Sequence, residues 1–148
     1  MGGVNGTPIL PSTSVDGKEL PFHVGVAHME RYNGEPFDME SNRSVAQYIY
    51  MGELDDNDTL PYGDAYNEDE RELAVAILGD SMAERWLTSQ SIIGAQELPI
   101  RFATYGAIGH ETTNVTESDV TTFLRANIGE VIALPDPAGE TVSGLREE

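Results

Sequence analysis

The chain has 148 residues, which is enough for one domain with a modest hydrophobic core. Its 26 acidic and 8 basic residues give a formal net charge of -18 and no basic patch that would neutralise phosphates, so the sequence argues against nucleic acid and anionic membranes as partners. The chain has no cysteine, which excludes disulfides, thiol nucleophiles and cysteine metal sites.

The same charge indicates the surroundings to which the protein is adapted. Nearly all basic residues are arginine, and Lys18 is the only lysine. Self-repulsion at this charge weakens the compact state at low salt, whereas high salt screens it, so we predict a halophilic protein. Because the chain has no run of about 18 apolar residues and Met1 does not open a signal peptide, we expect a cytoplasmic location.

The first part of the chain carries few signals of regular structure. Residues 1–21 are rich in Gly, Pro, Ser and Thr without a period, so we expect an extended loop that adds little to the core of a domain over residues 22–128. A short helix is expected over residues 27–33 with Gly34 as its stop, and a further helical turn over residues 38–43.

The first clear strand leads directly into an acidic loop. Residues 45–51 are mostly β-branched, aromatic or apolar, which favours a buried strand, and Gly52 ends it. The charged side chains begin only there, with Asp55, Asp56 and Asp58. In an open α/β sheet, ligands and catalytic groups collect just beyond the carboxyl ends of the strands, which is where these carboxylates lie.

Two helices follow, and each begins at a capping-box spacing. Asn67 has Glu70 three residues later, and Ser81 has Glu84 three residues later. The first of these helices is expected to stop at Gly79, and both carry apolar residues at helical intervals that face a core.

A second strand, loop and helix complete the predicted domain. A strand is expected over residues 99–105, then a loop containing His110, then a helix signalled by Thr116 and Asp119. Residues 129–148 are expected to form a mobile acidic tail. The order of elements predicts the α/β class with parallel strands, which would bring an aspartate and a histidine to one edge of the sheet.

Three short motifs in this order carry a family resemblance. They are Tyr48-Ile-Tyr-Met-Gly-Glu-Leu-Asp55, then Leu60-Pro61, then Tyr105-Gly-Ala-Ile-Gly-His110-Glu111. Together they resemble the last third to half of α/β-hydrolase-fold enzymes, in which Gly-x-x-Asp after a strand gives the triad acid and a Gly-His turn gives the base. The resemblance implies a partial α/β-hydrolase fold over residues 45–128, with Asp55 as the catalytic acid and His110 as the catalytic base.

The family's Gly-x-Ser-x-Gly nucleophile motif is absent from the sequence. The nearest imitation, around Ser81, lacks the second glycine and a preceding strand, and Ser81 is better explained as a helix cap. We therefore expect the C-terminal portion of a serine esterase-like hydrolase, inactive alone and without a cofactor. Its expected partners are a small acyl or ester substrate in the complete enzyme, and a polypeptide carrying the nucleophile or a second copy at an exposed sheet edge.

Several alternatives stay open at the level of sequence. Asp58 is the alternative acid, Asp56 is expected to face solvent, and a lone loop histidine such as His110 is usually structural. A calcium loop beginning at Asp55 would need glycine and glutamate where Leu60 and Tyr66 stand, and one beginning at Asp56 fails likewise, so no metal site is predicted. The alternative function is a non-catalytic acidic α/β module that binds a protein or a cation, and a third possibility is a decayed reading frame.

Overall fold

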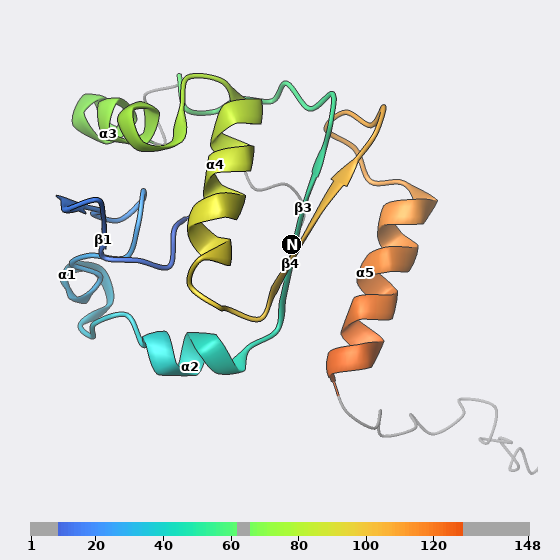
Figure 1. Ribbon diagram of the computed structural model, residues 1–148, viewed down its shortest axis with the longest axis horizontal. Helices are drawn as coiled ribbons and strands as arrows, with labels where there is room; N and C mark the ends of the chain where they lie inside the picture. The colour runs from blue at the N-terminus through green and yellow to red at the C-terminus, as the bar shows by residue number, and fades with distance from the viewer. Residues whose placement is uncertain (1–8, 62–65, 129–148) are drawn as a thin grey trace, which may run out of the picture.

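A computed structural model describes residues 9–61 and 66–128, and a pair of parallel strands organises them. β3 (Gln47–Gly52) pairs with β4 (Ile100–Tyr105), with Gln47 opposite Ile100 and Gly52 opposite Tyr105. Both strands run in the same direction, so their carboxyl ends meet at the top of the sheet in Figure 1. The α/β class with parallel strands is therefore confirmed, although a sheet of two strands does not define a particular α/β fold. The expected tail over residues 129–148 lies outside the described residues.

The long helices begin largely where their caps predict. α3 (Glu68–Leu78) and α4 (Met82–Gly94) both start at the complete capping boxes that the sequence indicates. α5 (Asn114–Asn127) starts earlier than expected, because Thr113 is its cap and the hydroxyl of Thr116 accepts a hydrogen bond from the Thr113 N–H at 2.8 Å. A threonine thus takes the place that glutamate holds in the usual capping box, which is why the sequence pattern hid this start.

Residues 9–44, called the N-terminal segment below, are more ordered and more buried than the sequence suggests. It contains a short antiparallel hairpin of β1 (Ser14–Val15) and β2 (Lys18–Glu19), followed by α1 (Glu30–Asn33) and α2 (Met39–Ser44). The expectation that it adds little to the core is wrong, because Leu10 and Leu20 are fully buried. Isolated leucines on a loop have no period, so a pattern search does not find them.

The main hydrophobic core lies between this N-terminal segment, α3 and α4. Its buried members are Leu10, Leu20, Val24, Leu60, Tyr66, Ala74, Leu78 and Ile93. A smaller cluster of Met51, Met82 and Trp86 joins α4 to one face of the sheet. The Trp86 Nε1–H donates to Thr104 Oγ1 at 2.8 Å and its ring packs edge-on against Phe102, which fixes α4 to β4.

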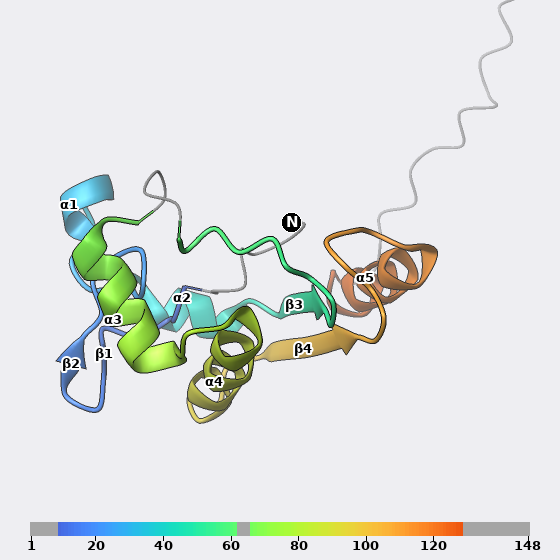
Figure 2. The same cartoon turned by 90° about the horizontal axis from the view of Figure 1, so that it is seen from above.

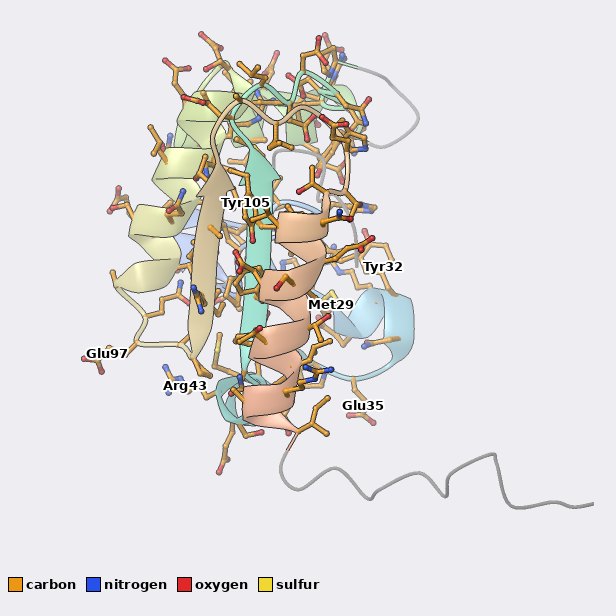
Figure 3. The ribbon with its side chains drawn as sticks, turned by 90° about the vertical axis from the view of Figure 1, so that its right-hand side faces the viewer. Met29, Tyr32, Glu35, Arg43, Glu97 and Tyr105 are labelled. Carbon is orange, nitrogen blue, oxygen red and sulfur yellow. The ribbon has the colours of Figure 1, made fainter. Side chains whose placement is uncertain are left out.

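α5 covers the opposite face of the sheet, as Figures 1 and 2 show. Its contact with the sheet is largely aromatic and polar. The hydroxyls of Tyr48 and Tyr105 lie 2.7 Å apart, and the Tyr105 hydroxyl donates to Asp119 of α5 at 2.9 Å. Figure 3 labels Tyr105 at this side of the sheet, beside α5. Burial, followed by these two hydrogen bonds, raises the pKa of Tyr105 well above the ordinary value of 10.0.

None of the helices within residues 9–61 and 66–128 has the length and apolar character that crossing a membrane requires.

Candidate acid–base site

The loops that follow β3 and β4 bring Asp55 and His110 together. His110 Nδ1 lies 3.0 Å from Asp55 Oδ2, although the residues are far apart in the sequence. The side chain of Asp55 is only 6% exposed, whereas that of His110 is 46% exposed. A shielded carboxylate thus holds one nitrogen of an imidazole whose ring reaches solvent.

Two backbone hydrogen bonds join the loops just before these side chains. The Glu53 N–H donates to the Tyr105 carbonyl and the Leu54 N–H donates to the Ile108 carbonyl, both at 2.8 Å. Gly52 allows this close approach, because a Cβ there would collide with the carbonyl oxygens of Ile108 and Gly109. The glycine that ends the strand therefore also sets the spacing between the two loops.

The contacts of the two side chains favour one tautomer of the neutral His110 ring. An ionised aspartate only accepts hydrogen bonds, so the proton between the two residues lies on His110 Nδ1. The other nitrogen, Nε2, then carries a lone pair, and it lies 3.4 Å from the Asn57 Nδ2 amide, which is a donor. The second Asp55 oxygen, Oδ1, accepts the Asn57 backbone N–H at 3.0 Å and so holds the carboxylate in place. This arrangement leaves Nε2 as the basic atom of the pair.

A small cavity of about 110 Å³ adjoins the pair. It is lined by Tyr50, Met51, Gly52, Asp55, Gly109, His110, Glu111 and Thr112. Pockets that bury a small-molecule ligand usually have volumes from about 300 Å³. The cavity beside the imidazole is therefore smaller than the pockets that usually enclose a small-molecule ligand.

Asp58, the alternative acid, points elsewhere. Its Oδ2 lies 2.6 Å from Nη2 of Arg85, which is fully buried on α4, and its Oδ1 accepts the Leu60 N–H at 3.0 Å. The Arg85 Nη1–H also donates to the Asp80 carbonyl at 2.6 Å. Asp58 is thus engaged in anchoring the acidic loop to α4, and Asp55 is the aspartate in contact with His110.

Arg85 is the residue near this site that the sequence reading missed. It belongs to the buried stripe of α4, which consists of Met82, Arg85, Trp86, Ser89 and Ile93. Those positions follow the spacing of one helical face, so an arginine on that face was a signal that a buried ion pair was needed.

The remaining candidates take ordinary structural positions. Asp56 is exposed, as predicted, and the Ser81 hydroxyl accepts the Glu84 N–H as a helix cap. Within the part of the chain that the structure describes, no three histidine, aspartate or glutamate side chains converge as a metal site would require.

Searches of protein families, of curated proteins and of solved structures found no match to this chain.

Proposed function

We propose that this chain supplies the acid–base pair of an α/β-hydrolase-like serine hydrolase that acts on a small acyl or ester substrate. In this proposal Asp55 orients His110, His110 is the general base, and the serine is carried by polypeptide outside these 148 residues. The observation that supports it most is the 3.0 Å contact between a shielded carboxylate and a solvent-accessible imidazole at adjacent parallel strand ends.

The proposed chemistry follows from the tautomer of His110. Its Nε2 lone pair would accept the proton of a serine hydroxyl as the serine oxygen forms a bond to the substrate carbonyl carbon. The resulting imidazolium would be stabilised by Asp55 and would then return the proton to the leaving alcohol as the carbonyl–oxygen bond breaks. Water would repeat both proton transfers and release the acid. Without a serine and an oxyanion hole, the pair alone does not perform this reaction.

In the proposed hydrolase, further strands of the sheet would pair with the edge of β3 that faces away from β4. The N–H groups of Gln47 and Glu53 donate towards β4. Because backbone groups alternate along a strand, those of Tyr48 and Tyr50 point to the opposite edge. Within residues 9–61 and 66–128 no other strand pairs with β3, so a strand from the polypeptide that carries the serine would extend the sheet on that side.

A single cysteine tests whether His110 acts as a base. The chain has no cysteine, so Asn57→Cys places a unique thiol next to His110 Nε2. If His110 takes up the thiol proton, the more reactive thiolate forms at neutral pH. We expect Asn57→Cys to react with iodoacetamide at pH 7 at least about fivefold faster than Asp56→Cys, an exposed neighbour in the same acidic loop. Both rates are measured in molar salt, which screens the acidic surface, so that the different net charges of the two variants have little effect on the rates.

Two further variants test whether His110 and Asp55 cause the higher reactivity of the thiol in Asn57→Cys. Adding His110→Gln to Asn57→Cys should remove the rate advantage, and adding Asp55→Asn should reduce it, because an asparagine amide favours the wrong imidazole tautomer. Equal rates for Asn57→Cys with and without His110→Gln would remove His110 from the proposed mechanism.

A further inference from the structure

We propose that Glu53 is a positioning residue for this pair: its carboxylate holds the turn that carries His110 against Asp55. The inference rests on the proposed function, in which His110 is the base. It goes beyond that function because it assigns to a surface glutamate the task of fixing where the base lies.

The contact that carries the inference links a side chain after β3 to the backbone after β4. Glu53 Oε2 accepts the N–H of Ala107 at 3.0 Å. The same oxygen borders Gly106, where an added Cβ would lie 3.5 Å from it. The carboxylate therefore contacts the turn formed by Gly106 and Ala107, which leads into His110.

That turn has a conformation that needs support. Ala107 has a φ of 58°, in the left-handed region that side chains other than glycine adopt at an energetic cost. A charge-assisted hydrogen bond to the N–H of the strained residue favours this conformation over relaxed alternatives. Only two residues separate Ala107 from His110, so a change in the turn is passed directly to the imidazole.

Besides the contacts that His110 makes with Asp55 and Asn57, three hydrogen bonds join the two loops, and the Glu53 side chain forms one of them. Two are backbone hydrogen bonds, from Glu53 to the Tyr105 carbonyl and from Leu54 to the Ile108 carbonyl. Any residue other than proline forms those bonds. The third, to Ala107, needs a side chain with an acceptor at the reach of glutamate. Its loss leaves the turn fixed at its two ends and free at its centre.

Two substitutions separate the hydrogen bond from the charge. Glu53→Gln removes the charge but keeps an oxygen that accepts the Ala107 N–H, whereas Glu53→Ala removes both. The readouts are hydrogen exchange of the Ala107 amide and the ¹⁵N NMR signals of the His110 ring, which report which nitrogen carries the proton. A thermal unfolding curve of each full-length variant shows that it is folded.

We expect Glu53→Ala to raise the exchange rate of the Ala107 amide about tenfold and to shift the His110 signals away from the single Nδ1-protonated form. Glu53→Gln should retain both wild-type signatures. If Glu53→Ala does not fold, Glu53→Asp, which keeps the charge and shortens the reach, should show the same two changes.

Two results would overturn the inference. One is a folded Glu53→Ala or Glu53→Asp variant with wild-type His110 signals. The other is a Glu53→Gln variant that loses those signals as Glu53→Ala does, because charge and not the hydrogen bond would then be responsible. These measurements need no nucleophile and no substrate. A failure of the Asn57→Cys experiment would therefore remove the proposed function without altering the result for Glu53.

Discussion

The two sides of the sheet are held in different ways. On the α4 side, the N-terminal segment, α3 and α4 enclose the main apolar core, and a smaller apolar cluster joins α4 to the sheet. On the α5 side, Thr116 is the only buried residue of the helix, and Leu124 and Ile128 remain 47% and 64% exposed. Stability therefore resides mainly on the α4 side, while the candidate pair lies in loops at the end of the sheet, beyond the main core.

Removing a buried leucine should have the largest effect. Leu20 is fully buried in the main core, so Leu20→Ala should lower the free energy of unfolding by about 3 kcal/mol. The matched variant Leu124→Ala, on the exposed side of α5, should cost less than about 1 kcal/mol. Chemical denaturation in molar salt measures both. Equal losses would show that α5 is held as tightly as the main core.

Breaking the link between the acidic loop and α4 should come next. Asp58→Ala leaves the buried Arg85 without this carboxylate, and a loss of about 2–3 kcal/mol is expected, less than for a fully buried pair because Asp58 keeps some exposure. Asp56→Ala is the control and should change stability by no more than about 0.5 kcal/mol. If both variants unfold alike, the Asp58–Arg85 pair does not anchor the loop.

The polar contact beneath α5 should have the smallest effect and a distinct pH dependence. Tyr105→Phe removes the hydrogen bonds to Tyr48 and Asp119 and should cost about 1–2 kcal/mol at neutral pH. Burial and these bonds raise the pKa of Tyr105, so above pH 10.0 the unfolded chain loses this proton first and wild-type stability falls.

In Tyr105→Phe that contribution is absent, and stability should fall less steeply between pH 10 and pH 11.5. Burial also raises the pKa of Tyr66, but this residue is present in both proteins and does not contribute to the difference between their slopes. Thermal unfolding at three pH values compares the slopes. Parallel slopes would mean that the Tyr105 hydroxyl is not shielded by α5.

Local sequence signals predicted much of the helical and strand structure, because caps and apolar runs act over a few residues. Asn67 and Ser81 mark the starts of α3 and α4, and the run before Gly52 marks β3. The meeting of Asp55 with His110 was also predicted, since parallel strands place their carboxyl ends together.

The remaining features depend on contacts between distant parts of the chain. Leu10 and Leu20 enter the core from a loop without a repeating pattern. The pairing of Asp58 with Arg85 could not be read from the acidic loop alone, because the arginine comes from α4. The contact between the hydroxyls of Tyr48 and Tyr105 could not be predicted either, because the two residues lie on different strands. The hydrogen bond from Tyr105 to Asp119 adds a third element, α5, to this contact.

The chain carries its own optical probe for these experiments. Trp86 is the only tryptophan, it is buried, and its ring bridges α4 and β4. Its fluorescence should shift to longer wavelength when α4 leaves the sheet and the indole enters water. The emission of one native residue can thus report whether each variant keeps the framework that presents Asp55 and His110, without any attached label.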